Sequence, residues 1–205
     1  MSDLSSYMRQ CPLVAILRGV TPLEVDGVAD ILAAAGFCIM EIPLNSPNAL
    51  VSIERLARRF DQQILVGAGT VLEVGSVARV AAAGGRLIVA PNADADVVME
   101  AKRMRLSAVP GVFTPTEAFS MIKAGADALK LFPAEAASPS VLRAMRTVLP
   151  AGTAVLPVGG IRPESLEAWW QAGAAGFGLG SALYTPSGTL DQIQANAQAF
   201  LKALA

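Results

Sequence analysis

The residue with the clearest chemical potential is Lys130, which lies in the apolar run 128–133 (ALKLFP). Removing an ammonium group from water is costly, so a buried lysine tends to lose its proton and its pKa falls. The neutral amine is a nucleophile that adds to a carbonyl carbon and forms a Schiff base. The alternative is a lysine that extends its charged end to solvent from the end of a strand.

Two more ionisable residues, Arg18 and Glu41, lie within predicted strands. Glu41 is a candidate general acid–base, because a carboxylate in a partly dry site can have its pKa moved toward the working pH. Arg18 is a candidate anion clamp, since its planar guanidinium matches a carboxylate or phosphate with two hydrogen bonds. The alternative is that Glu41 only pairs with Arg18 or Lys130 and that neither Glu41 nor Arg18 contacts a substrate.

Glycine-rich segments follow three predicted strands. Gly159 and Gly160 follow the seventh strand, and Gly180 with Ser181 follows the eighth. Backbone N–H groups in such a pair of loops commonly hold phosphate in (β/α)₈ enzymes. In the segment 67–70 (GAGT) after the third strand, the Thr70 hydroxyl is a candidate for holding a substrate carboxylate. The alternative is that these glycines only permit tight turns.

The elements that must position these residues repeat about every 20 to 26 residues, as in successive βα units. The predicted strands are Leu13–Arg18, Phe37–Ile42, Ile64–Gly67, Leu87–Ala90, Ser107–Val109, Ala128–Phe132, Ala154–Val158 and Gly176–Leu179. The predicted helices are Pro22–Ala35, Asn48–Phe60, Glu73–Ala83, Asp94–Arg105, Thr114–Ala124, Pro139–Val148, Pro163–Ala172 and Leu190–Leu204. A short helix within residues 1–10 is predicted to cover the barrel floor.

This order of elements predicts a single domain, residues 1–205, folded as a (β/α)₈ TIM barrel. An open doubly wound sheet is the alternative, but it needs a glycine-rich turn after its first strand, and the segment 18–22 (RGVTP) is not GxGxxG. In a barrel the carboxyl ends of the strands face the catalytic mouth, so Arg18, Glu41 and Lys130 are expected to converge. Arg86 and Asp127 precede their strands and are expected at the opposite end.

Composition excludes several classes of function. The chain has no histidine, which removes histidine bases and every histidine-containing metal site. A net charge of −1 provides no basic field for nucleic acid. The longest uncharged run, 168–190, is interrupted by glycine and proline, so it predicts no membrane span. No signal peptide is predicted, and Cys11 and Cys38 have no motif spacing, which suits the cytoplasm.

Four segments, 41–47 (EIPLNSP), 67–71 (GAGTV), 130–135 (KLFPAE) and 158–160 (VGG), together resemble the 2-keto-3-deoxy-6-phosphogluconate/galactonate class I aldolases. The resemblance runs in order over essentially the whole chain. It implies a homotrimeric barrel without metal or cofactor, in which Lys130 forms the Schiff base and Glu41 moves protons. The implied substrate is a keto-deoxy sugar-acid phosphate, cleaved to pyruvate and glyceraldehyde 3-phosphate.

Two positions depart from the gluconate branch of this family, which usually has arginine where this chain has Asn45 and threonine where it has Val158. The run 17–19 (LRG) looks like the galactonate branch instead. We therefore expect the galactonate-configured substrate, with the gluconate epimer as the competitor. The carboxylate is expected at Arg18 and Thr70, the C4 hydroxyl near Val158, and the phosphate at Gly159, Gly160, Gly180 and Ser181.

Two other classes share part of this pattern. A phosphate-binding barrel isomerase or epimerase would use the same glycine loops, but it would not need a lysine buried in a strand. A non-catalytic sugar-phosphate-binding protein would also keep the anion loops without Lys130. Trapping of pyruvate on one lysine by borohydride is expected only of the aldolase.

Overall fold

The computed structural model describes residues 3–204. Its strands are β1 (Leu13–Ile16), β2 (Ile39–Pro43), β3 (Leu65–Gly69), β4 (Leu87–Val89), β5 (Ser107–Val109), β6 (Gly111–Val112), β7 (Leu129–Leu131), β8 (Val155–Pro157) and β9 (Phe177–Leu179). Its helices are α1 (Asp3–Gln10), α2 (Val25–Ala35), α3 (Ala49–Phe60), α4 (Val74–Ala82), α5 (Ala95–Arg103), α6 (Pro115–Ala124), α7 (Pro139–Arg146), α8 (Leu166–Gln171) and α9 (Leu190–Leu204), with 3₁₀ turns η1 (Ala134–Ala136) and η2 (Pro163–Ser165). Each predicted element has a counterpart, with ends that differ by a few residues.

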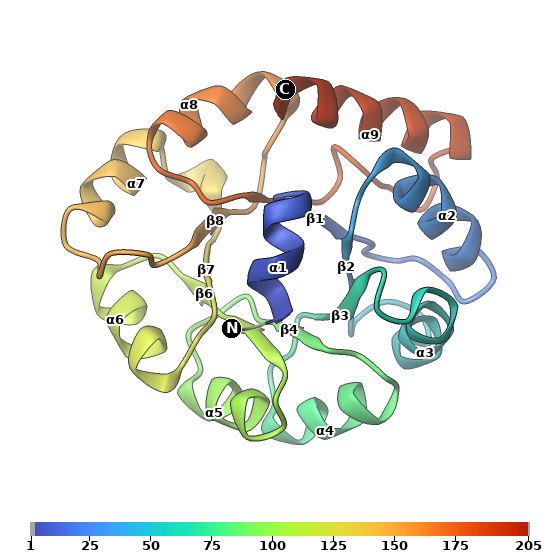
Figure 1. Ribbon diagram of the computed structural model, residues 1–205, viewed down its shortest axis with the longest axis horizontal. Coiled ribbons are helices and arrows are strands. Elements are labelled where there is room, and N and C mark those ends of the chain that lie inside the picture. Colours follow the sequence, from blue (N-terminus) through green and yellow to red (C-terminus); the bar gives the residue numbers. More distant parts are fainter. Residues whose placement is uncertain (1–2, 205) are drawn as a thin grey trace.

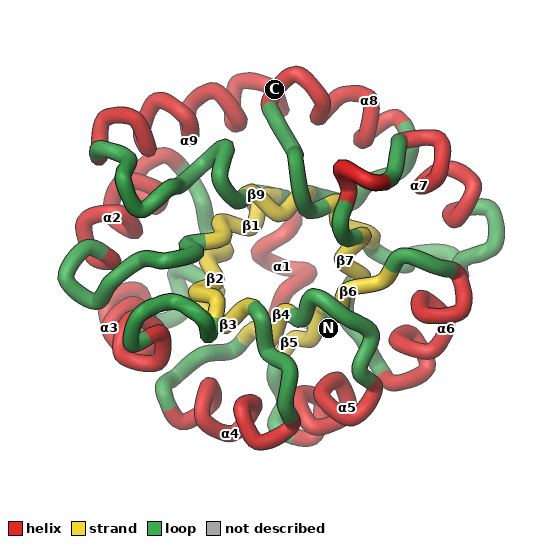
Figure 2. Tube along the Cα trace, turned by 180° about the vertical axis from the view of Figure 1, so that it is seen from behind, coloured by secondary structure: helices red, strands yellow, loops and turns green. Residues whose placement is uncertain are grey.

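The strands form a TIM-barrel-like ring that is surrounded by helices α2 to α9 (Figures 1 and 2). All strand pairs are parallel, in a six-stranded sheet of order β5-β4-β3-β2-β1-β9 and a three-stranded sheet of order β6-β7-β8. The strands are buried throughout, which is why they read as continuous apolar runs in the sequence. The parallel arrangement brings their carboxyl ends to one mouth.

The ladder of hydrogen bonds differs from the single closed ring that we expected. Pro110 lies between β5 and β6, and because proline has no backbone N–H, the strand is interrupted there. At the other seam, β8 ends at Pro157, and only an isolated bridge between Val158 and Gly178 is assigned there among residues 3–204. Both seams therefore occur beside a proline that cannot donate to the ladder.

The opposite opening of the ring is covered by α1, as expected for a short helix near the N-terminus (Figure 1). Residues 1 and 2 of the predicted 1–10 segment lie outside the described residues. Arg86 donates to Gln62 Oε1 at 2.9 Å, and Asp127 pairs with Lys102 at 2.5 Å. Arg86 and Asp127 thus form structural contacts away from the mouth, as expected. Within residues 3–204 no helix is long and apolar enough to cross a membrane.

Candidate active site

Lys130 is the central residue of β7, where its backbone pairs with Gly111 of β6 and Leu156 of β8. The residue is 5% exposed, and its Nζ lies 4.3 Å from the centroid of the Phe132 ring. Burial lowers the pKa of the Lys130 ammonium; the carboxylate of Glu41 opposes this shift and the charge of Arg18 adds to it. The side chain therefore does not extend to solvent, and its environment favours the nucleophilic amine.

Glu41 is the central residue of β2 and is 2% exposed. Its Oε2 atom is buried without a hydrogen-bond partner. The carboxylate fits because residue 69 of β3 is glycine, where any Cβ would overlap it. Burial raises the pKa of Glu41 to about 7, although the charges of Lys130 and Arg18 act in the opposite direction. Near neutral pH the group is thus present as both acid and base.

Arg18 was predicted to end the first strand, but β1 ends at Ile16, so Arg18 lies in the turn two residues further on. Its Nη1 donates to Asn45 Oδ1 at 2.7 Å and its Nη2 to Thr70 Oγ1 at 3.4 Å. Within residues 3–204, neither Arg18 nor Lys130 forms a hydrogen bond or ion pair with Glu41. The structural alternative, in which Glu41 is their ion-pair partner, is therefore not observed.

Thr70 has a left-handed backbone with φ of 55°, which is unusual for a β-branched residue. Such strain costs on the order of 1–3 kcal/mol and concentrates at functional sites. The hydroxyl of Thr70 accepts from Arg18, so the strained residue lies beside the guanidinium. This geometry agrees with the expected pairing of Thr70 and Arg18.

A cleft of about 330 Å³ opens at the carboxyl ends of the strands. Seven of the predicted site residues line it: Arg18, Lys130, Val158, Gly159, Gly160, Gly180 and Ser181. The two other predicted residues lie nearby, since Thr70 contacts Arg18 and Glu41 lines a smaller cavity together with Lys130 and Val158. Residues from distant parts of the chain are thus brought to one mouth.

Two charged residues of the cleft, Arg162 and Glu135, were not predicted from the sequence. Arg162 follows the Gly159–Gly160 turn and lies outside every strand, so a search of strands for charges does not find it. Glu135 lies in η1, and its carboxylate abuts Gly159, where any Cβ would overlap it. The sequence did contain a signal for each residue. Glu135 belongs to the 130–135 segment that also contains Lys130, and Arg162 follows Gly160 by two residues, so both could have been proposed as site residues.

The described residues contain no group of three or more Cys, Asp or Glu side chains placed to hold a metal ion. The site instead combines a desolvated amine, a buried proton carrier and a cleft with backbone N–H groups and arginines. A buried amine and a proton carrier beside a cleft that contains arginine side chains suit covalent chemistry on the carbonyl group of an anionic substrate.

Comparison with known proteins supports this chemistry. The model of the family described as "KDPG and KHG aldolase" matches residues 4–198. The chain therefore belongs to the KDPG and KHG aldolase family, and it is an aldehyde-lyase of the class I type.

Among curated relatives, the 2-dehydro-3-deoxy-6-phosphogalactonate aldolase of Escherichia coli strain K12 is 43% identical over 96% of both chains. The 2-dehydro-3-deoxy-phosphogluconate aldolase of Zymomonas mobilis is 30% identical over 80% of this chain and 78% of its own. A solved structure titled "Native KDPGal structure" matches with a TM-score of 0.94 at 43% identity and covers 95% of both chains. KDPG aldolase from Legionella pneumophila, solved with pyruvate as a covalent carbinolamine, matches with a TM-score of 0.85 at 26% identity over 95% of this chain and 96% of its own.

Proposed function

We propose that this chain cleaves 2-dehydro-3-deoxy-6-phosphogalactonate to pyruvate and D-glyceraldehyde 3-phosphate. The observation that carries the proposal is the buried pair Lys130 and Glu41, whose pKa values are shifted in opposite directions, beside a cleft lined by Arg18 and Arg162. An amine whose pKa is lowered by burial and a carboxyl group whose pKa is raised to about 7 supply the two functions that Schiff-base cleavage requires.

The reaction begins when the neutral amine of Lys130 adds to the C2 ketone and forms a carbinolamine. Protonated Glu41 gives its proton to the carbinolamine hydroxyl, which leaves as water, so that an iminium forms on Lys130. The Glu41 carboxylate then takes the proton of the C4 hydroxyl, the C3–C4 bond breaks, and its electrons flow into the iminium to give an enamine. Glyceraldehyde 3-phosphate departs, and Glu41 returns the proton that it took from the C4 hydroxyl to C3 of the enamine. Water then adds to the iminium and gives a proton to Glu41, and the carbinolamine collapses to release pyruvate and the neutral amine of Lys130.

The two anionic ends of the substrate are assigned to opposite ends of the cleft. Arg18, held by Asn45 and Thr70, takes the carboxylate through charge-assisted hydrogen bonds. Backbone N–H groups near Gly159, Gly160, Gly180 and Ser181 take the phosphate. The positive charge of Arg162 at the same end favours this assignment, although Glu135 opposes it in part.

Val158 accounts for the choice between epimers. Its side chain lines both the outer cleft and the inner cavity that contains Glu41 and Lys130, which supports its assignment to the C4 hydroxyl, between the two ends of the substrate. A valine has no group that hydrogen-bonds the C4 hydroxyl. The site therefore lacks a contact that would select the gluconate configuration, and the 43% identity to a phosphogalactonate aldolase agrees with this view.

We further propose a single-domain (β/α)₈ barrel that acts in the cytoplasm as a homotrimer. Strands β5 and β6 then count as one strand interrupted at Pro110, whose carbonyl accepts from the Lys130 N–H at 2.9 Å. The buried free thiols of Cys11 and Cys38 are compatible with a reducing compartment. Exposed large apolar side chains occur around the ring, and five of them lie from the start of α4 to α6, where a second copy would cover them: Leu72, Val74, Met99, Phe113 and Phe119.

The test has two arms on the same preparation. Incubation with pyruvate and borohydride is expected to add one pyruvate-derived mass to Lys130, and pyruvate release is measured from both epimeric substrates side by side. Faster release from the galactonate epimer supports the full proposal. An adduct with faster release from the gluconate epimer retains the chemistry and rejects the substrate, while absence of the adduct rejects the Schiff-base mechanism.

A further inference from the structure

A small cavity lies beside the catalytic pair, on the side of the barrel floor. It measures about 20 Å³, and its polar wall consists of Glu41 and Lys130 among otherwise apolar residues such as Leu87, Val109 and Leu156. Leu4, which belongs to α1 and not to the barrel, also lines this cavity. A side chain from the N-terminal helix therefore lines the same small cavity as the two reactive groups.

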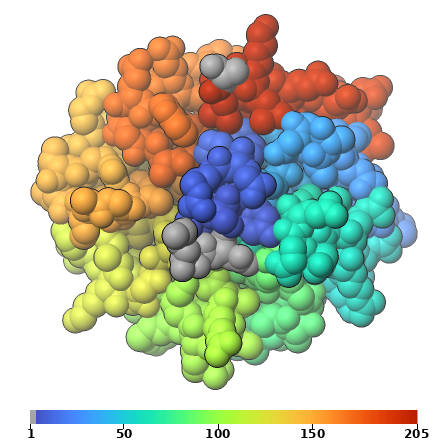
Figure 3. Space-filling model, viewed as in Figure 1, coloured from blue at the N-terminus to red at the C-terminus, as the bar shows by residue number. Residues whose placement is uncertain are grey.

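The helix that carries Leu4 closes the barrel on the side opposite the substrate cleft. In Figure 3 the atoms of α1 cover the middle of this face. The Leu4 N–H donates to Ser107 Oγ at 3.3 Å, and the Tyr7 hydroxyl donates to the carbonyl of Gln62. Leu4 is itself only 2% exposed. The helix is thus held at the amino-terminal ends of β3 and β5, with Leu4 facing inward.

The size of this cavity matters because a water molecule needs only about 10–15 Å³ of such space together with polar partners. The cavity therefore has room for about one water, for which the unsatisfied Oε2 of Glu41 is an acceptor, and opening the floor would connect it to bulk solvent. Lys130 is faced by Glu41 from β2 and by Arg18 from the turn after β1, with the Phe132 ring directly after its own strand. Since burial is the largest cause of the shifted pKa of both Glu41 and Lys130, water from below would undo both shifts.

We propose that Leu4 is a positioning residue of the active site: by closing the floor of the barrel, it keeps bulk water away from Lys130 and Glu41. Through this one residue, the N-terminal helix supports the active site without contacting substrate. The proposal rests on the proposed function for its consequence, because only an enzyme that uses the free amine of Lys130 loses activity when this amine is rehydrated.

The direct test measures the pKa of Lys130 in the free protein by competitive acetylation with acetic anhydride over a range of pH, followed by mass spectrometry. Leu4→Ala enlarges the cavity and admits water, so the pKa of Lys130 is expected to rise by about one unit. The rate of pyruvate trapping at pH 7 is then expected to fall about tenfold and to recover at alkaline pH. A loss that is equal at every pH would indicate a structural role only.

Met8→Ala is the matched control, because Met8 lies on the same helix and packs on the core near Gly176 without lining the cavity. It is expected to leave the pKa of Lys130 unchanged. Leu4→Val removes less volume, is expected to give a smaller shift, and carries the test if Leu4→Ala does not fold. A folded Leu4 variant with the wild-type pKa, or an equal shift in Met8→Ala, overturns the inference. Failure of the wild-type protein to trap pyruvate rejects the proposed function instead, since the acetylation experiment does not depend on it.

Discussion

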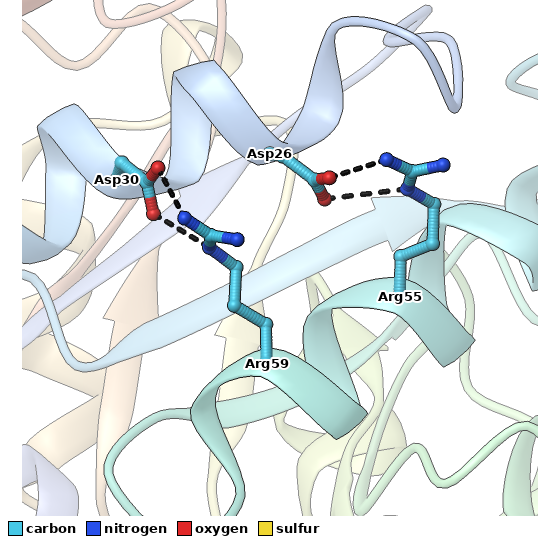
Figure 4. Close-up of polar contacts among 4 residues, drawn as sticks. All are labelled: Asp26, Asp30, Arg55 and Arg59. Atoms are coloured by element: carbon cyan, nitrogen blue, oxygen red, sulfur yellow. Dashed lines mark hydrogen bonds and ion pairs between the residues drawn. The ribbon is translucent and has the colours of Figure 1, made fainter.

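Two regions of this molecule that contain acidic and basic side chains differ in whether these side chains form ion pairs. On the outer surface, Asp26 and Asp30 of α2 form bidentate ion pairs with Arg55 and Arg59 of α3 (Figure 4). Inside the mouth of the barrel, Glu41 lies near Lys130 without a hydrogen bond or an ion pair to it among residues 3–204. The surface groups are fully partnered, whereas the interior groups are not.

The pKa values show what this difference produces. The hydrogen bond from Arg55 holds the pKa of Asp26 below its usual value, so this carboxylate stays charged. Burial instead raises the pKa of Glu41 to about 7 and lowers that of Lys130. Solvent-exposed pairs are geometrically good but contribute little to stability. The buried groups cost stability, but Glu41 can exchange its proton near neutral pH, and the lowered pKa of Lys130 favours the reactive neutral amine.

Lys130→Met is expected to have the largest effect, because it removes the nucleophile while keeping a chain of similar volume. We expect kcat/KM to fall by about 10⁴-fold or more and the borohydride-stable adduct with pyruvate to disappear. The free energy of unfolding should not decrease, since the lost group is a buried amine. Chemical denaturation and mass spectrometry check both statements, and an adduct on Lys130→Met would reject the assignment.

Glu41→Gln is expected to lower turnover by about 10²–10⁴-fold while adduct formation continues more slowly. Although turnover falls, the free energy of unfolding of this variant should rise relative to wild type at alkaline pH. Wild-type Glu41 binds its proton more tightly in the folded state, so its contribution to stability is lost as the pH rises from 4.5 through about 7. Glutamine does not titrate.

The Glu41→Gln variant is therefore expected to be more stable than wild type at pH 8 by on the order of 3 kcal/mol, and equally stable below pH 4.5. Urea denaturation at the two pH values measures this. Glu54→Gln on the exposed surface of α3 is the control, and it should not reproduce the pH dependence. A Glu41→Gln variant that is less stable at pH 8 would mean that the buried carboxylate is stabilising.

Arg162→Gln tests whether a cleft residue outside the strands binds the phosphate. In the condensation direction, KM for glyceraldehyde 3-phosphate is expected to rise about 10- to 100-fold, as for loss of one charge-assisted hydrogen bond. KM for unphosphorylated glyceraldehyde should stay constant. Arg143→Gln, on α7 and outside the cleft, is the control. Equal changes for both aldehydes would exclude a contact with phosphate.

Val158→Thr is expected to change selectivity and leave most of the activity intact. A hydroxyl at this position can bond the C4 hydroxyl, so the ratio of gluconate to galactonate cleavage should rise roughly two- to tenfold. The ratio of the two kcat/KM values is the measurement. An unchanged ratio would show that Val158 does not determine the choice of epimer.

Asp30→Asn is expected to have the smallest effect. It breaks an ion pair whose two side chains are 45% and 46% exposed, so kcat/KM should not change. Any decrease in the free energy of unfolding should be smaller than the increase expected for Glu41→Gln at pH 8, and it should shrink at high salt. A larger loss than this would mean that the surface pairs hold α2 against α3.

The sequence was sufficient to predict which residues converge, but not how each is held. Lys130 and Glu41 were recognisable because charged side chains are rare in apolar strands. The position of Arg18 in a turn, and its bonds to Asn45 and Thr70, depend on contacts between segments that are distant in the chain. Arg162 was missed because no periodicity marks a loop residue. The interruption of the ring at Pro110 was not predicted, because a missing N–H breaks the ladder only where a neighbouring strand would accept a hydrogen bond from it.

The contact between Gly69 and Glu41 has an evolutionary consequence. The obstacle to a side chain at position 69 is the carboxylate itself, since a Cβ there would overlap Glu41 and this glycine does not require a left-handed backbone. The two positions are therefore epistatic: an alanine at 69 is incompatible with the present position of the glutamate, whereas a shorter residue at 41 would make it tolerable. Mutational libraries that vary one position at a time will find residue 69 intolerant, and paired libraries will recover folded but inactive proteins.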